Sequence, residues 1–276
     1  MYSQFWAILL SSQWSLWTPY SIHRCTIFLR NLSFLEICYI SVTLPKLLQT
    51  FVAKKKTIPF YGCCAQMYCF FTLGVTECFL LAVMAYDRFV AICNPLRYFS
   101  VMNKTTCLKM ATLSWLSGNL ISLGQTASIF SLPYCGPNLI NHFFCDIPPL
   151  LKLACTDVRA NEISVSVTGF LVLPTATFFS SALFLCTNTG RKKVFSTCAS
   201  HFVSVTLFFG TGAFTYVRVK TSDTPDNDKL LSLLYSVITP LLNPLIYSLR
   251  NQEVKGGLKK ILYKSDSIKD AKPSAK

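Results

Sequence analysis

The sequence predicts an all-α fold, a multi-pass transmembrane helical bundle. First, 52% of the 276 residues are hydrophobic and only 14% are charged, whereas an ordinary soluble domain carries about 25% charged residues. Second, the apolar residues gather into six stretches, each close to the roughly 20 residues that cross a bilayer as a helix. Because lipid offers no water, the backbone amides of each stretch must bond within it, as in a helix. The composition excludes a disordered chain, a nucleic-acid-binding domain and a small secreted disulfide scaffold.

The predicted spans follow one another along the chain, with one long connection between the third and the fourth. They are Phe28–Gln49, Cys64–Tyr86, Met110–Leu132, Ile163–Thr187, Val194–Val217 and Leu230–Leu249. The last four contain no Asp, Glu, Lys or Arg. Buried helices of a soluble core are the alternative, but six such stretches rarely coexist in so short a chain. Residues 1–22 are uncharged yet interrupted by Pro19, and their three Trp favour a segment at the membrane interface over a spanning helix.

The basic residues predict the orientation. With a cytosolic C-terminus, most of the 26 Lys and Arg lie on the inner side, although Lys54, Lys55 and Lys56 lie outside. The net charge of +14 therefore reflects the orientation of the chain in the membrane and predicts no nucleic-acid partner. Residues 251–263 read as an amphipathic helix on the inner leaflet, attracted by anionic lipid. Residues 264–276 read as a disordered cytosolic tail.

Four of the 13 Cys fall on the outer, oxidising side of this topology. These are Cys63, at the outer end of the second span, and Cys135, Cys145 and Cys155 in the following long outer loop. Four thiols allow three pairings, and their spacing does not choose among them. A zinc site is an alternative that the regular ten-residue spacing does not favour.

Polar groups at membrane depth are candidate functional residues. Glu36 and Glu77 lie in the first two spans and Asn243 in the sixth, and two carboxylates with an amide suit a small cation such as sodium. The alternative is protonated carboxyl groups hydrogen-bonded between helices. A channel or transporter lined by Glu36 and Glu77 is a competing function, but no inverted repeat supports it. No motif joins His201 to a nucleophile, so no enzyme is predicted.

Several motifs together carry a family resemblance. They are LSFLEICYISVTLPKLL, GCCAQM, TECFLLAVMAYDRFVAICNPLRY, HFFCDIPPLLKLACTD, RKKVFSTCASH and PLLNPLIYSLRN. With them the chain resembles olfactory (odorant) receptors, a branch of the rhodopsin-like G protein-coupled receptors, from about Thr26 to Leu262. The resemblance implies seven helices, of which the six spans would be the second to seventh, within a bundle covering residues 27–250. It also implies location in the plasma membrane, an odorant ligand and a heterotrimeric G protein of the stimulatory olfactory type, acting through cAMP.

The resemblance further implies roles for individual residues. It pairs Cys63 with Cys145 and Cys135 with Cys155, and it assigns Glu36, Glu77 and Asn243 to a sodium pocket. The residues that would form the G protein and activation switch are Asp87, Arg88, Asn243, Pro244 and Tyr247. The residues that would line the odorant cavity, unless they serve ordinary helix packing, are Phe70, Phe71, Gly74, Val75, Thr168, Phe209, Gly212 and Tyr216. An apolar pocket with a few polar groups suits a small volatile ligand.

The chain departs from the family pattern at three places. Residues 1–26 lack the Gly-Asn pair of the family's first helix, and residues 21–26 read as the family's Leu-His-Thr-Pro-Met-Tyr segment translated one base out of frame. The cytosolic extension of the fourth span is shortened, and Phe89 replaces the tyrosine after Asp87-Arg88. We therefore expect poor trafficking, with retention in the endoplasmic reticulum, or an inactive receptor.

Overall fold

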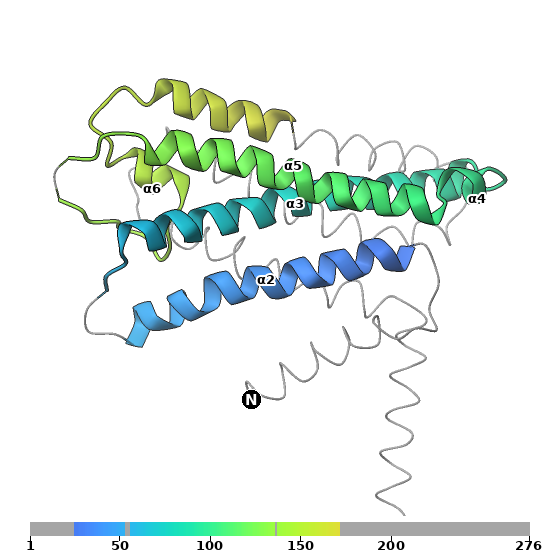
Figure 1. Ribbon diagram of the computed structural model, residues 1–276, viewed down its shortest axis with the longest axis horizontal. Coiled ribbons are helices and arrows are strands. Elements are labelled where there is room, and N and C mark those ends of the chain that lie inside the picture. The colour runs from blue at the N-terminus through green and yellow to red at the C-terminus, as the bar shows by residue number, and fades with distance from the viewer. Residues whose placement is uncertain (1–24, 53–55, 136, 172–276) are drawn as a thin grey trace, which may run out of the picture.

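The computed structural model describes residues 25–52, 56–135 and 137–171 (Figure 1). The labelled helices in these ranges are α2 (Cys25–Val52), α3 (Phe60–Cys93), α4 (Tyr98–Val101), α5 (Lys104–Phe130) and α6 (Ile147–Leu151). A further helix begins at residue 159 and continues to residue 171. The described residues contain no strand, apart from an isolated antiparallel bridge between Tyr134 and Ala154. The predicted all-α class is confirmed for this part of the chain.

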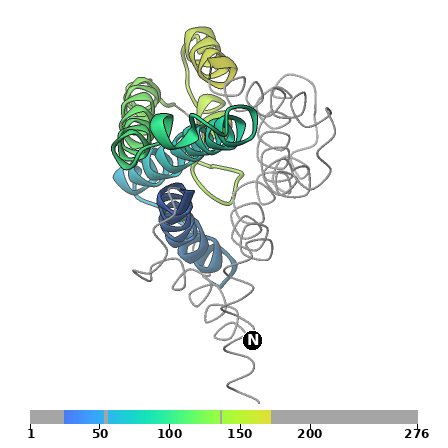
Figure 2. The ribbon, with the colours of Figure 1, turned by 90° about the vertical axis from the view of Figure 1, so that its right-hand side faces the viewer.

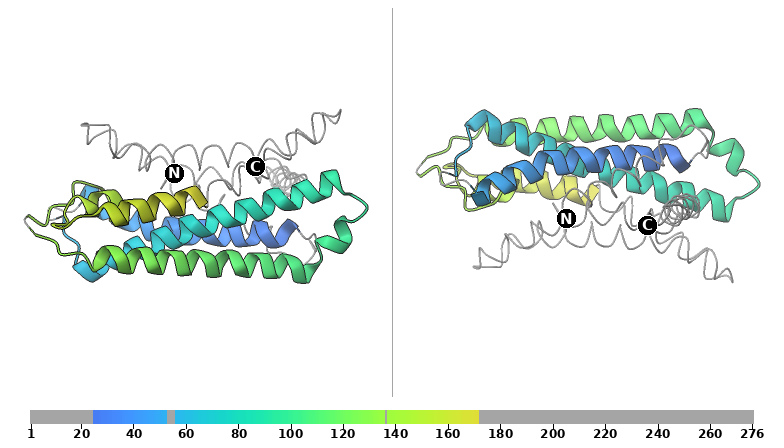
Figure 3. Two further views of the ribbon diagram at one scale, coloured as in Figure 1. Left: turned by 90° about the horizontal axis from the view of Figure 1, so that it is seen from above. Right: turned by 90° about the horizontal axis from the view of Figure 1, so that it is seen from below.

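The long helices run in alternating directions along a common axis (Figures 1 and 3). Viewed nearly end-on, α3 lies between α2 and α5 and packs against both (Figure 2). With 34 residues, α3 is about 51 Å long at 1.5 Å per residue. It therefore joins the two ends of the described bundle in one unbroken helix.

The first two predicted spans are confirmed as helices of sufficient length and apolarity to cross a membrane. Within the described residues, two segments meet that test, Ile27–Thr50 and Phe60–Cys93. The helix containing the second span extends beyond the predicted bounds at both ends. Pro59 immediately precedes the first residue of this helix. The helix ends before Asn94, because the proline that follows, Pro95, disfavours a helical conformation at Asn94.

Most of the third predicted span is helical, but the helix starts six residues earlier than predicted and ends two residues earlier. The helix begins at Lys104 and ends at Phe130, because Asn103 caps its start by accepting a hydrogen bond from Thr106 N at 2.8 Å. Hydropathy does not detect such a cap. The helix also carries Gly, Ser, Gln and Thr along its buried face, and α5 is more polar than α2 and α3.

The core forms where apolar faces of these helices meet. One cluster joins α2 to α3 through side chains such as Leu35, Tyr39, Phe70 and Leu80, each less than one-tenth exposed. A smaller cluster on α3 packs against Ile121 of α5. A third cluster, at the start of α3, includes Cys63, Met67, Ile129, Cys145 and Ile147. Together they hold α3 on several sides.

The remaining sequence predictions lie outside the described residues. These are the spans Val194–Val217 and Leu230–Leu249, most of Ile163–Thr187, the amphipathic segment 251–263, the tail 264–276 and the interfacial segment 1–22. The start of the fourth span, up to residue 171, is helical.

Candidate functional site

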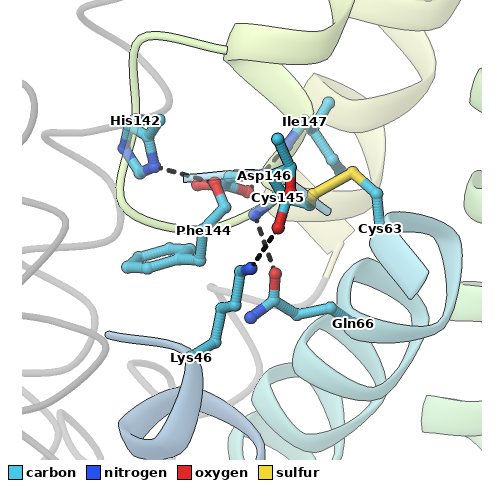
Figure 4. The surroundings of a disulfide bond; sticks show 9 residues. Lys46, Cys63, Gln66, His142, Phe144, Cys145, Asp146 and Ile147 are labelled. Atoms are coloured by element: carbon cyan, nitrogen blue, oxygen red, sulfur yellow. Dashed lines mark hydrogen bonds between the residues drawn. A yellow bond between two sulfur atoms is a disulfide. The ribbon is translucent and has the colours of Figure 1, made fainter. Parts of the chain in front are cut away.

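One end of α3 is tied to the loop that follows α5 by a disulfide between Cys63 and Cys145, with their Cα atoms 5.5 Å apart (Figure 4). One turn further along the helix, Gln66 Oε1 accepts a hydrogen bond from Cys145 N at 3.1 Å. A second disulfide joins Cys135 to Cys155 within the loop. Together the two bridges form the pairing scheme that the family resemblance implies, one of the three schemes that spacing alone allows. We call this region the disulfide end.

The same loop is packed onto the helices by aromatic contacts. Phe144, next to the disulfide, lies 5.2 Å from Phe70 of α3 between ring centroids, and Phe70 lies 5.1 Å from Tyr39 of α2. His142 lies edge-on to Phe144 with the centroids 4.8 Å apart, and its Nδ1 lies 3.0 Å from Phe144 O. The loop therefore covers the disulfide end of α2 and α3.

The predicted cavity residues fall into different environments. Phe70 is buried in the α2–α3 core and Val75 in the α3–α5 cluster, so both serve helix packing. Phe71 and Gly74 are half-buried, and a side chain added at Gly74 would meet open space. Thr168 Oγ1 accepts a hydrogen bond from Gln125 Nε2 at 3.0 Å, which links the helix of residues 159–171 to α5. Phe209, Gly212 and Tyr216 lie outside the described residues.

The two predicted sodium-binding carboxyl groups lie on helices that pack together. Glu36 of α2 is 1% exposed and Glu77 of α3 is fully buried. The third predicted ligand, Asn243, lies outside the described residues. In the described part of the chain, no group of three or more His, Cys, Asp or Glu side chains is arranged to hold a metal ion. The sodium site stays a prediction.

At the opposite end of α3, the carboxylate of Asp87 is buried and held from two sides. Tyr98 of α4 donates a hydrogen bond from its hydroxyl to Asp87 Oδ1 at 2.9 Å. Arg88 Nε lies 3.9 Å from Asp87 Oδ2. Asp87 is 1% exposed, while the Arg88 side chain is about a third exposed. We call Asp87, Arg88 and Tyr98 the Asp87 cluster; its predicted companions Asn243, Pro244 and Tyr247 lie outside the described residues.

Comparison with known proteins identifies the family. Residues 11–265 match the family model described as olfactory receptor. The chain belongs to the olfactory receptor family. It is 50% identical over 244 residues to human olfactory receptor 10A7, covering 85% of this chain and 77% of the relative. It is 49% identical to human olfactory receptor 5I1 over 244 residues, 85% and 78% of the two chains. It is 46% identical to mouse olfactory receptor 8U3 over 246 residues, 86% and 77% of the two chains.

Membership of the olfactory receptor family implies a seven-helix G protein-coupled receptor, a multi-pass protein of the plasma membrane. Glu36 and Glu77 therefore belong to a receptor, and the channel or transporter reading is not favoured. The extra helix that the family has beyond the six predicted spans would precede α2. The residues there, 1–24, lie outside the described residues.

Sequence reasoning missed two features of the receptor at the Asp87 cluster. Tyr98 ends the TECFLLAVMAYDRFVAICNPLRY motif, yet nothing in its spacing from Asp87 predicts that the turn at residues 94–97 brings the two together. Leu96 is 97% exposed and Phe99 is 71% exposed beside this turn. Two large apolar residues on either side of Arg97 are the signal that could have marked this surface, because apolar side chains exposed together can mark an interaction site.

Proposed function

We propose that this receptor binds small volatile odorants between the helices near the disulfide end and activates a heterotrimeric G protein of the stimulatory olfactory type at the Asp87 end. The observation that carries the proposal is the buried Asp87 carboxylate, held by Tyr98 and Arg88 at the far end of α3. We propose that this restrained charge and its arginine form a two-state element, and α3 joins it to the covered end. In this proposal Arg88 leaves Asp87 on activation and engages the G protein.

The surface beside the Asp87 cluster supports a protein partner. Leu96 and Phe99 project from the turn and α4 with little burial, while Arg88 and Arg97 lie close in sequence. An apolar anchor flanked by cations fits the central contact of a protein interface. We propose that these residues contact the G protein from the cytosolic side, which also sets the C-terminus in the cytosol.

The odorant site is proposed to use the half-buried side of α3 around Phe71 and Gly74. The open space at Gly74 and the hydroxyl of Thr168 on the neighbouring helix supply an apolar surface with a polar group nearby. This composition suits a small, mostly apolar ligand with one or two hydrogen-bonding atoms. Phe70 and Val75 would affect ligand binding indirectly, because they pack against neighbouring helices and fix the position of α3.

We propose sodium as an allosteric ligand between α2 and α3. The two carboxyl groups of Glu36 and Glu77 are almost completely buried on packed helices, and carboxylate oxygens are ligands that a hard cation takes. A cation held by oxygen ligands offsets that charge. Protonation of one or both groups remains the competing explanation, and the two differ in their response to sodium concentration.

We also propose that surface display of the receptor is low, with much of the chain held in the endoplasmic reticulum. Residues 1–26 carry neither the family's Gly-Asn pair nor a long uninterrupted apolar stretch. Loss of the family's first helix would leave small and polar surface of the bundle facing lipid. Antibody labelling of a loop tag in intact cells measures this, and display equal to that of a full family member would refute it.

The function is tested by odorant-evoked cAMP in cells that express the olfactory stimulatory G protein and a trafficking chaperone. We expect at least one volatile in a broad panel to raise cAMP, and Arg88→Ala to remove the response at equal surface display. Arg159→Ala is the matched control, because Arg159 is exposed and contacts Asp157 at the other end of the molecule. A ligand-independent ion current, with no cAMP response, would contradict the receptor proposal and favour a channel.

A further inference from the structure

Several Ser and Thr side chains in these helices donate a hydrogen bond to a carbonyl of their own helix. Thr43 Oγ1 donates to Tyr39 O at 2.9 Å. Ser114 Oγ donates to Met110 O at 2.9 Å. Bonds of the same type occur on the exposed faces, for example at Ser166. A bond to the carbonyl four residues earlier is the ordinary way in which a Ser or Thr inside a helix is satisfied.

A group of buried polar atoms between α3 and α5 departs from this pattern. Within the described part of the chain, these side-chain oxygens have no hydrogen-bond partner, although every one of the residues is at most 6% exposed. They are Thr72 Oγ1, Thr76 Oγ1, Ser122 Oγ, Gln125 Oε1 and Thr126 Oγ1. We call these five residues the α3–α5 polar seam.

The seam follows the line along which the two helices touch. A side chain at Gly118 of α5 would strike Thr76 of α3 and would lie only 3.1 Å from Thr76 N, so the two backbones approach closely there. Because α3 and α5 run in opposite directions (Figure 1), one turn toward the disulfide end leads from this contact to Thr72 and Ser122. The next turn of α5 carries Gln125 and Thr126. The five residues therefore lie on successive turns along the contact between the two helices.

We propose that the α3–α5 polar seam binds internal water molecules that bridge the two helices, beginning between Thr72 and Ser122. Buried polar groups away from lipid and bulk water need partners, and internal water that meets two to four polar groups is their usual one. Water can donate to the Gln125 carbonyl oxygen and can donate to or accept from a hydroxyl group, so it suits every atom of the seam. The close approach at Gly118 favours the smallest molecule that does so.

The same side chain of Gln125 extends the seam to a third helix. Its Nε2 donates to Ser164 Oγ at 2.8 Å and to Thr168 Oγ1 at 3.0 Å, which uses both amide hydrogens and leaves Oε1 directed elsewhere. Water at Oε1 would then link α3, α5 and the helix of residues 159–171 in one hydrogen-bonded network. Thr168 is also a candidate odorant contact, so the water network would border the ligand site.

A double-mutant cycle distinguishes bridging water from hydroxyl groups that turn to their own helix. The variants are Thr72→Val, Ser122→Ala and the pair, with Thr43→Val, Ser114→Ala and their pair as controls whose hydroxyls bond within one helix. We expect each seam variant to lower the melting temperature of the purified receptor by roughly 2–4 °C, and the pair to lose clearly less than the sum. The first substitution already leaves the water underbonded, so the second removes less. The control pair should be additive within about 1–2 °C.

A structure of the wild-type receptor keeps the proposal testable even if the variants fold poorly. We expect isolated density within about 2.7–3.2 Å of Thr72 Oγ1 and Ser122 Oγ in a map by electron cryomicroscopy that resolves other buried waters. Strict additivity of the seam pair would overturn the proposal. So would a seam without density in such a map, or elongated density that indicates an organic molecule in place of water.

Discussion

The hydrogen bond from Tyr98 to Asp87 leads to the sharpest test of the activation switch. Tyr98→Phe removes one hydroxyl and keeps the ring. The bond is 2.9 Å long and its acceptor carboxylate is 1% exposed. A hydrogen bond to a charged group contributes about 1.5–3 kcal/mol, and because Tyr98 is half-buried we take the lower limit of that range.

If the bond exists only in the resting arrangement, its loss shifts the balance between resting and active states by the same free energy. A change of about 1.4 kcal/mol is a factor of ten in an equilibrium constant. A receptor that is rarely active without ligand should therefore show roughly tenfold higher basal activity. Asp87 would still be held by Arg88, so the variant is not expected to become fully active.

The assay is cAMP in the absence of odorant, divided by the amount of receptor at the cell surface. Tyr68→Phe is the matched control, because Tyr68 of α3 also donates from its hydroxyl at 2.9 Å, but to Asn119 of α5. The control should lower thermal stability and leave basal cAMP per surface receptor unchanged. Equal basal activity of Tyr98→Phe and wild type would refute the reasoning, as would an equal rise in both variants.

Three further changes follow from the structure. Cys145→Ser opens a disulfide that spans 82 residues, so we expect a loss of about 4 kcal/mol in stability and loss of surface labelling; labelling at the wild-type level would contradict this. Gly118→Ala drives a methyl group into Thr76 and, in a thermal melt, should lower stability by about 1–3 kcal/mol despite the higher helix propensity of Ala. Gly124→Ala is the control: its methyl group meets open space, so this variant should be neutral or stabilising in the same melt. Glu36→Gln should abolish the rise in melting temperature that sodium chloride produces over potassium chloride in the wild type, and no such rise in the wild type would remove the sodium proposal.

The helices could be predicted because a chain segment inside lipid must satisfy its own backbone hydrogen bonds, which a helix does. The apolar stretches around Leu35 and around Leu80 must form their backbone hydrogen bonds within themselves, so hydropathy alone located α2 and α3. The ends of the helices depend on single residues, and the Asn103 cap moved the start of α5 to Lys104. Hydropathy averages over about 19 residues and does not register one amide side chain.

The candidate site was less accessible from the sequence. Spacing left three disulfide pairings for four outer cysteines, and the choice between them depends on the path of the loop around Phe144. The contact between Tyr98 and Asp87 depends on the turn between α3 and α4, which no periodicity describes. The unpartnered hydroxyl groups at Thr72 and Ser122 were hidden for a different reason. Ser and Thr are common in spanning helices, and only the packed neighbours decide whether they find a partner.

The close crossing of α3 and α5 also constrains how related receptors can diverge. A residue larger than glycine at the position of Gly118 requires the opposing position to shrink or the helices to separate. Paired change is therefore expected. A relative with Ala or Ser there should carry Gly or Ala in place of Thr76, and swapping one member of such a pair between two receptors should be tolerated less well than swapping both.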